Sequence, residues 1–406
     1  MIRLLDGPNF SGRSAWLEAK ADSLPWPQSA LLLCSGESAL TGLATSVGEE
    51  LAMSTDPLLD GANIACNDRR EQPALELDLL LDRPMHVLSG GEMVRCALAS
   101  ALAQGVDELL VDVALEQLDT RWRSLLLAMF SGGSATVDLT ICDNRLSLDE
   151  RALAGETVRF TAADGGNTPA PTMDGEALAN LLDERRCVAE LSQVSFRYGR
   201  RLPYIFENLS LTLEPGHLYV LAGSNGAGKT TLLRLLSGTV VPTRGRIMFE
   251  GGQFVPRRRE RFVALSFQNP DYQFSRGTIG SEIIESLGTE KAQVGLEPLA
   301  AHGGIPSALL DTNPFDCPFT FKKRLANLIA VVAGKPIIAF DEPTLGQDES
   351  YRAEFAKLAQ SLTRRGRTIL LISHDDNLLA ALEDKIILGI GDGSVSLMDP
   401  RVTATS

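Results

Sequence analysis

The stretch LYVLAGSNGAGKTTLLRLLSG, residues 218–238, decides the fold of the second half of the chain. A short apolar run comes first, a glycine-rich loop follows, and a helical apolar pattern begins at the lysine. The loop GSNGAGKT, residues 223–230, matches the phosphate-loop pattern G-x-x-x-x-G-K-[ST] at every fixed position. Its glycines would let backbone N–H groups surround phosphates at a helix N-terminus. We therefore expect a phosphate-binding site between a strand and a helix.

Within this loop, Lys229 would reach the β- and γ-phosphates and the hydroxyl of Thr230 would bind Mg²⁺. A glycine-rich turn without a ligand is the alternative, but the order strand, loop, helix favours the phosphate site. The expected ligand contacts of the loop are Gly223, Ser224, Asn225, Gly226, Ala227, Gly228, Lys229, Thr230 and Thr231.

Two further polar groups follow apolar strand-like runs. In PIIAFDEP, Asp341 ends a run where it could bind Mg²⁺ through water, and Glu342 could act as general base toward the attacking water. His374 follows the next run, TILLIS, at the same predicted sheet edge as the phosphate loop. A solvated turn and a structural histidine are the alternatives, but the buried strands make them the weaker interpretation.

The first half looks like a divergent copy of the second. GPNFSGRS, residues 7–14, keeps the spacing of the phosphate loop but has Arg13 in place of the lysine. The segments 88–102 and 317–331 both precede a strand that ends in aspartate, Asp112 or Asp341, with the same spacing. This preserved spacing predicts an internal repeat of a whole α/β domain.

Over residues 187–406, these motifs in this order resemble the ATP-binding cassette (ABC) family. The resemblance implies ATP and Mg²⁺ as cofactors. It implies that Gln268 senses nucleotide and contacts the membrane partner, and that Tyr198 stacks on adenine. The catalytic set is then Glu342, His374 and Gln268, and the metal set is Thr230, Gln268 and Asp341.

One ABC element is missing from the second half and present in the first. ABC domains carry an LSGGQ-like signature at a helix N-terminus, which meets the γ-phosphate held by the opposite domain. That position reads CPFTF at 317–321, where Pro318 has no N–H and the phenylalanines are bulky. LSGGE occurs at 88–92 instead, so the resemblance assigns nucleotide contacts to Ser89, Gly90 and Gly91.

The remaining motifs of the first half are damaged. Arg13 does not substitute for a compact ammonium, and Val113 stands where the general base belongs. We align Cys142 with His374 and Gly36 with Gln268. Because ABC domains pair head to tail, we expect one intact composite site and one broken site. Pairing within one chain and pairing in a homodimer both remain open.

The expected architecture is therefore two P-loop NTPase domains of the ABC nucleotide-binding type in tandem. Residues 1–160 form the shortened, degenerate domain, residues 161–186 the linker, and residues 187–406 the intact domain. The linker is expected because 161–186 is rich in Gly, Pro, Thr and charged residues.

The segments FQNPDYQF (267–274) and DEPTLGQD (341–348) are similar to the ATPases of energy-coupling factor (ECF) transporters, which import vitamins and metal ions. This likeness implies an ATP-hydrolysing, cytoplasmic subunit, peripheral on the inner face of the cell membrane and docked on a separate integral membrane subunit. The alternative is a soluble tandem ABC ATPase that acts on ribosomes or nucleic acid. A net charge of −14 argues against non-specific nucleic-acid binding.

Overall fold

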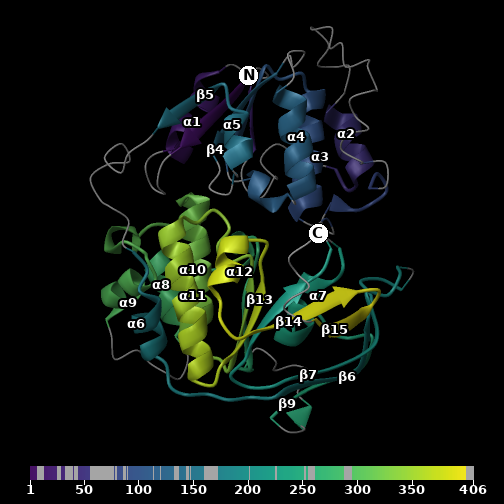
Figure 1. Cartoon of the computed structure of the whole chain (residues 1–406), viewed down its shortest axis with the longest axis vertical. Coiled ribbons are helices and arrows are strands. Elements are labelled where there is room, and N and C mark those ends of the chain that lie inside the picture. Colours follow the sequence, from purple (N-terminus) through teal and green to yellow (C-terminus); the bar gives the residue numbers. More distant parts are fainter. Residues whose placement is uncertain are drawn as a thin grey trace. The chain divides into compact units, whose positions relative to one another are not determined.

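The computed structural model divides into two compact units, unit 1 (Met1–Pro169) and unit 2 (Ala170–Ser406), which we describe separately (Figure 1). The residues that it describes are 1–6, 13–24, 29–32, 40, 44–54, 77, 80–85, 88, 90–112, 114–118, 120–131, 137–142, 146, 148–159, 172–200, 202–224, 226–250, 253–254, 261–287 and 295–398.

The main sheet of unit 2 has the strand order β11-β12-β13-β8-β14-β15. Its strands are β8 (Leu218–Ala222), β11 (Val263–Ser266), β12 (Ile337–Asp341), β13 (Thr368–Ile372), β14 (Lys385–Gly391) and β15 (Ser394–Met398). All neighbours pair in parallel except β14 and β15. The carboxyl ends of the parallel strands therefore meet at one edge, as expected for an α/β nucleotide-binding fold.

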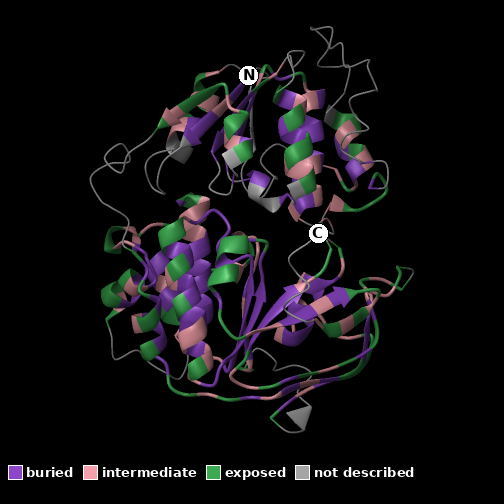
Figure 2. Cartoon of the chain, in the orientation of Figure 1, coloured by how far each residue is buried: buried purple, intermediate pink, exposed green. Residues whose placement is uncertain are grey.

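A second, antiparallel sheet covers one face of this sheet. It has the order β10-β9-β6-β7 and contains β6 (Ala189–Phe196), β7 (Phe206–Leu213), β9 (Arg244–Phe249) and β10 (Gln253–Phe254). Helix α7 (Lys229–Ser237) contributes four buried leucines to the hydrophobic core that joins the two sheets. In Figure 2 the strands of the main sheet are largely coloured as buried.

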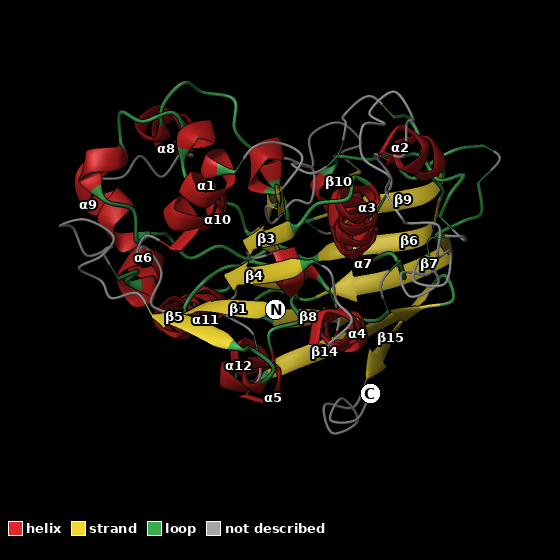
Figure 3. Cartoon of the chain, turned by 90° about the horizontal axis from the view of Figure 1, so that it is seen from above, coloured by secondary structure: helices red, strands yellow, loops and turns green. Residues whose placement is uncertain are grey.

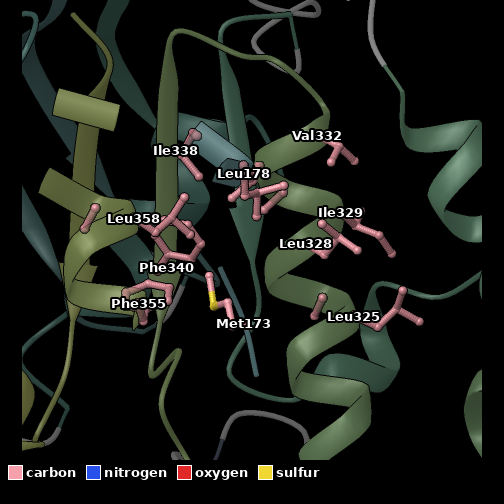
Figure 4. Close-up of a cluster of buried hydrophobic side chains, with 14 of the residues drawn as sticks. Met173, Leu178, Leu325, Leu328, Ile329, Val332, Ile338, Phe340, Phe355 and Leu358 are labelled. Carbon is pink, nitrogen blue, oxygen red and sulfur yellow. The ribbon is translucent and has the colours of Figure 1, made fainter. Parts of the chain in front are cut away.

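Helices form a second core on the other side of the main sheet. They are α6 (Gly175–Asn180), α8 (Ile279–Ser286), α9 (Leu296–His302), α10 (Phe319–Val332), α11 (Glu349–Arg364) and α12 (Asp376–Ala381), with short 3₁₀ turns η7 (Pro270–Tyr272), η8 (Ser307–Leu309) and η9 (Pro314–Asp316). In Figure 4, Leu325 and Ile329 of α10, Phe340 of β12 and Phe355 of α11 gather in this cluster. This packing fixes α10 and α11 beside the strand ends.

The expectation that all of 161–186 is a linker was wrong for residues 172–186. Asp174 caps α6 by accepting a hydrogen bond from the Ala177 N–H at 2.9 Å, and Leu178 and Leu182 are buried in the helical core. Arg365 Nη1 donates to the Leu182 carbonyl at 2.9 Å. The polar composition of the segment concealed this short amphipathic helix.

Unit 1 contains a five-stranded parallel sheet of order β2-β3-β4-β1-β5. The strands are β1 (Ile2–Asp6), β2 (Ser29–Leu32), β3 (Glu108–Asp112), β4 (Asp138–Cys142) and β5 (Glu156–Arg159), and Figure 3 shows β3, β4, β1 and β5 side by side. The helices are α1 (Arg13–Ser23), α2 (Val47–Ser54), α3 (Gly90–Ala103), α4 (Thr120–Ser131) and α5 (Leu148–Ala152), with the 3₁₀ turn η5 (Ala114–Gln117).

The two units share this topology. The order β2-β3-β4-β1-β5 corresponds strand by strand to β11-β12-β13-β8-β14. Helix α1 begins at Arg13 and α7 begins at Lys229, the corresponding position of the second phosphate loop. Helices α3 and α10 likewise begin at corresponding positions, Gly90 and Phe319. The repeated spacing in the sequence thus has a structural counterpart in both units.

Equivalent backbone bonds extend this correspondence to the helices. In unit 1 the N–H of Gly48 donates to the Leu81 carbonyl at 2.9 Å, and in unit 2 the N–H of Gly280 donates to the Leu310 carbonyl at 2.8 Å. The first turn of α2 and the first turn of α8 are therefore held in the same way.

Strand register corrects one residue alignment. Asp112 pairs with Cys142, whereas Asp341 pairs with Ile372, so Cys142 corresponds to Ile372 and not to His374. Leu32 pairs with Val111 as Ser266 pairs with Phe340, so the ends of β2 and β11 correspond. Gly36, which we aligned with Gln268, lies outside the described residues. Among the helices that the structure describes, none is long and apolar enough to cross a membrane.

Candidate nucleotide-binding site

The glycine loop of unit 2 connects the end of β8 to the start of α7. Gly228 is the N-cap of α7 with φ of 106°, and a Cβ on it would lie 2.7 Å from Ile205 Cγ2. Gly226 has φ of 80°, and no other atom lies within 4 Å of the place where its Cβ would be. Glycine is required at Gly228 by conformation and space, and at Gly226 by conformation. Asn225 lies outside the described residues.

The ammonium of Lys229 points back into this loop. Its Nζ donates to the carbonyl oxygen of Gly223 at 2.5 Å and to that of Ser224 at 3.1 Å. Burial lowers the pKa of Lys229, and the charges of Glu342 and Asp341 oppose that shift. The loop therefore holds a positive charge at the carbonyl groups of Gly223 and Ser224, as a site for a phosphate ligand requires.

Thr230 and Asp341 lie together at the sheet edge. The Thr230 hydroxyl donates to Asp341 Oδ2 at 2.8 Å. Burial raises the pKa of the Asp341 carboxyl, while the charge of Lys323 and the Thr230 hydrogen bond act in the opposite direction. A hydroxyl and a carboxylate are hard oxygen donors that fit Mg²⁺ bound also by phosphate. Within the described residues, no three His, Cys, Asp or Glu side chains form a metal-binding group.

Glu342 and His374 are brought together next to this pair. Glu342 is buried, and its Oε1 lies 3.9 Å from His374 Nε2, which belongs to a half-exposed side chain. The Glu342 N–H donates to the Ile372 carbonyl at 2.9 Å. Its φ of 49° is left-handed, a backbone conformation that costs a non-glycine residue about 1–3 kcal/mol and tends to occur at functional sites.

Gln268 lies in a loop that is fastened to α10. The side chain of Asn269 caps the turn η7 by accepting from the Asp271 N–H at 3.0 Å. Gln273 Nε2 donates to the Ala326 carbonyl at 3.0 Å, and Lys322 Nζ lies 2.9 Å from Asp271 Oδ1. The loop that carries Gln268 thus has a defined path beside the strand ends.

Tyr198 lies over the first turn of α7. Its hydroxyl is 3.2 Å from Thr231 Oγ1, and Arg234 Nη1 donates to it at 3.3 Å. The ring meets Phe196 edge to face, with the centroids 5.0 Å apart, and remains exposed. An exposed aromatic ring so close to the phosphate loop could stack on a nucleotide base.

The two signature segments begin corresponding helices in different units. Pro318 is the N-cap of α10 and has no side-chain cap bond, and the N–H groups of Phe321 and Lys322 donate to its carbonyl. Gly90 begins α3, Gly91 is buried, and Glu92 Oε1 accepts from Arg83 Nη1 at 2.9 Å. Ser89, Val113 and the side chain of Arg13 lie outside the described residues.

Sequence reasoning missed a buried polar network beneath the site. Asn327 Nδ2 donates to the Pro343 carbonyl at 2.9 Å and to the Tyr351 hydroxyl at 3.1 Å. Lys323 Nζ donates to three carbonyl oxygens at the site. The available signal was the run KKRLAN, which places polar side chains on a helix flanked by apolar residues.

Comparison with known proteins agrees with this geometry. Residues 206–345 match the family model described as ABC transporter, and this range includes the glycine loop and the Asp341–Glu342 pair. Over these residues, unit 2 is similar to the ATP-binding domains of ABC transporters. The match supports ATP hydrolysis by this nucleotide-binding cassette.

Several curated relatives carry the same kind of domain. The chain is 30% identical over 208 residues to the putative HMP/thiamine import ATP-binding protein YkoD of Bacillus subtilis. The aligned region covers 50% of this chain and 37% of that protein. The chain is 26% identical over 351 residues to a putative ABC transporter ATP-binding protein of Methanosarcina acetivorans, covering 79% and 65%. The chain therefore spans less than two thirds of the length of these relatives.

Among solved structures, the cassette is similar to cbiO1 from Clostridium perfringens, described as part of the ABC transporter complex cbiONQ. The identity is 22% and the TM-score 0.43, over 52% of this chain and 88% of that one. The cassette MJ0796 bound to ADP and Pi gives 19% identity and a TM-score of 0.45, over 51% and 96%.

Proposed function

We propose that this chain is the ATP-hydrolysing subunit of an ECF-type membrane importer, and that it works through one composite site. The observation that carries the proposal is the convergence of Lys229, the Thr230–Asp341 pair and the Glu342–His374 pair at one sheet edge. These groups are the charge, metal ligands and base that ATP hydrolysis requires.

Each residue has a chemical role in this proposal. Lys229 and the loop N–H groups bind the β- and γ-phosphates, and Tyr198 stacks on adenine. Thr230, Gln268 and Asp341 would hold Mg²⁺, which neutralises charge on the phosphates when bound. Glu342 accepts a proton from the attacking water. His374, 3.9 Å from the Glu342 carboxylate, orients the water and the γ-phosphate.

We assign unit 1 to a degenerate ABC domain that donates the signature. The shared strand order and the matching starts of α3 and α10 support this assignment. Ser89, Gly90 and Gly91 would then meet the γ-phosphate held by Lys229 of a paired unit 2. Pairing within one chain or in a homodimer gives the same composite site.

The importer role rests on the loop after Gln268 and on the names of the relatives. Tyr272 in that loop is 65% exposed and Phe315 is 51% exposed, and Phe315 meets Phe274 edge to face at 6.1 Å. Exposed aromatic side chains near a nucleotide sensor suit a membrane partner's cytoplasmic helix. YkoD is named a putative HMP/thiamine import ATP-binding protein, which supports a vitamin as cargo. The likeness of residues 267–274 and 341–348 to ECF ATPases makes a metal ion the other candidate cargo.

Affinity capture of the tagged full-length chain from detergent-solubilised membranes tests the importer role. We expect an integral membrane protein to be recovered with the chain, and Tyr272→Glu to abolish that recovery. Leu397→Glu is the matched control, because Leu397 is 75% exposed on β15, away from the loop after Gln268. Recovery of ribosomes or nucleic acid in place of a membrane protein would favour the soluble class and overturn the proposal.

A further inference from the structure

Lys323 is a fully buried cation in the second turn of α10, with 0% of its surface exposed. Its Nζ donates to the carbonyl oxygens of Phe267 at 2.6 Å, Gln268 at 3.3 Å and Asp341 at 2.7 Å. One ammonium therefore contacts the backbone of two of the three expected Mg²⁺ ligands, Gln268 and Asp341.

Packing of the helix does not require a lysine at this position. The corresponding residue of α3 in unit 1 is Val94, which is also fully buried. Transfer of an ammonium from water into a protein interior costs several kcal/mol unless hydrogen bonds compensate for it. A lysine in place of an apolar residue therefore indicates that its three bonds have a purpose beyond filling the core.

The three bonds lie where two strands stop pairing. The parallel ladder between β11 and β12 ends at the pair Ser266 and Phe340. Phe267, Gln268 and Asp341 are the next residues of those strands, and their carbonyl oxygens accept from Lys323. Lys323 thus links the ends of β11 and β12 beyond their last backbone pair.

We propose that Lys323 is a positioning residue of the ATPase site, which holds the backbone of Gln268 in register with Asp341. The inference rests on the proposed ATP hydrolysis and adds a cause for the fixed spacing of two Mg²⁺ ligands. Glu342 follows Asp341 directly, so the same contact restrains the start of the segment that carries the base. Lys323 itself touches neither phosphate nor water in this role.

The direct test is hydrogen exchange of the full chain without nucleotide, in wild type and in Lys323→Met and Lys323→Gln. We expect Lys323→Met to speed exchange about tenfold or more in peptides covering 267–274 and 341–345, with no change over 223–237. Lys323→Gln keeps donors for two carbonyl groups and should give an intermediate rate. Lys357→Met, which removes an exposed ammonium of α11, is the matched control and should exchange like wild type.

Turnover provides the second readout. Lys323→Met should lower kcat roughly 10²-fold, since small displacements of catalytic groups have effects of this size, and should raise the Mg²⁺ concentration for half-maximal turnover. ATP affinity measured in EDTA should stay within about twofold, because a change far from the phosphate loop adds little. Lys323→Gln should again be intermediate.

The outcomes separate this inference from the proposed function. Faster exchange at 267–274 with no ATPase activity in wild type would uphold the positioning role and overturn the proposed hydrolysis. Unchanged exchange there, or a lower kcat with an unchanged Mg²⁺ midpoint, would overturn the positioning role. If Lys323→Met fails to fold, Lys323→Gln decides by the same two measurements.

Discussion

The two units differ in the residues beneath the sheet edge more than in the sheet itself. Helix α10 of unit 2 carries buried Lys323 and Asn327, whereas the corresponding positions of α3 in unit 1 hold buried Val94 and Leu98. The same exchange recurs after β3 and β12, where Leu118 of unit 1 corresponds to buried Gln347 of unit 2. At these three positions unit 1 has apolar side chains and unit 2 has side chains that form hydrogen bonds.

The polar residues of unit 2 hold loops rather than the core. Gln347 Oε1 accepts from Arg324 Nε at 2.9 Å, and its amide donates to the Thr320 carbonyl at 2.9 Å. Replacement of a buried polar network by apolar residues is often neutral or stabilising. Unit 2 keeps this polar network, whereas unit 1 has apolar residues at the corresponding positions. This difference indicates that unit 2 is the unit that needs its loops in fixed positions.

Not every polar contact differs between the units. Arg95 lies over the Trp122 ring at 4.3 Å in unit 1, and Arg324 lies over the Tyr351 ring at 4.7 Å in unit 2. This cation–π contact joins the helix after the signature to the helix after the aspartate strand in both units. What both units keep is the frame, and what differs is the set of groups that face the site.

The largest effect is expected when substitutions directly after β12 in unit 2 and β3 in unit 1 are compared. Glu342→Gln should lower kcat by about 10²–10⁴, because the attacking water loses its base, while ATP affinity is retained. Val113→Glu should leave turnover within about twofold, since a single residue does not restore a site without the loop lysine. Steady-state ATPase assays and equilibrium ATP binding measure both. Near-normal turnover by Glu342→Gln would contradict the assignment of unit 2 as the working unit.

The next comparison places the same substitution in each of the two signature segments. Gly90→Arg should lower turnover about 10²-fold, because backbone donors to the γ-phosphate are blocked, although the change lies in unit 1. Phe319→Arg, at the corresponding position of α10, should change turnover no more than about twofold. Single-turnover and steady-state assays distinguish these outcomes. Equal losses in the two variants would mean that both signatures contact nucleotide.

The smallest expected effect is on stability. Asn327→Leu copies unit 1 and should cost about 1–3 kcal/mol, because it leaves the Tyr351 hydroxyl and Ser266 Oγ without their bonds. Ser266→Ala added to it should recover part of the loss, since both partners of one bond are then removed. All five tyrosines lie in unit 2 and all three tryptophans in unit 1, so tyrosine and tryptophan emission follow the units separately. An unchanged midpoint would show that the network does not stabilise unit 2.

The sequence predicted the elements whose signals are local. Short apolar runs predicted β3, β8, β12 and β13, and the phosphate loop predicted the start of α7 at Lys229. The sequence also predicted that His374 lies at the same sheet edge as the phosphate loop, because parallel strands bring their carboxyl ends to one edge. The structure adds the contacts of Thr230 with Asp341 and of Glu342 with His374.

What the sequence did not predict depends on contacts between distant segments. Composition marked 172–186 as a linker, because the burial of Leu178 depends on helices far along the chain. The alignment of Cys142 was two residues away from the strand register, which only the pairing with Asp112 defines. Lys323 reads as a surface residue, because burial of its ammonium depends on three carbonyl groups that lie elsewhere in the sequence.

The left-handed backbone at Glu342 has a consequence for how this domain can change over generations. Glycine and asparagine adopt a φ near 49° more easily than glutamate, so either would relieve strain at that position. A mutation that removes the base would then make the domain easier to fold. Selection for a stable protein therefore does not preserve Glu342, and loss of the residue would go unopposed as soon as the cell stopped needing hydrolysis there.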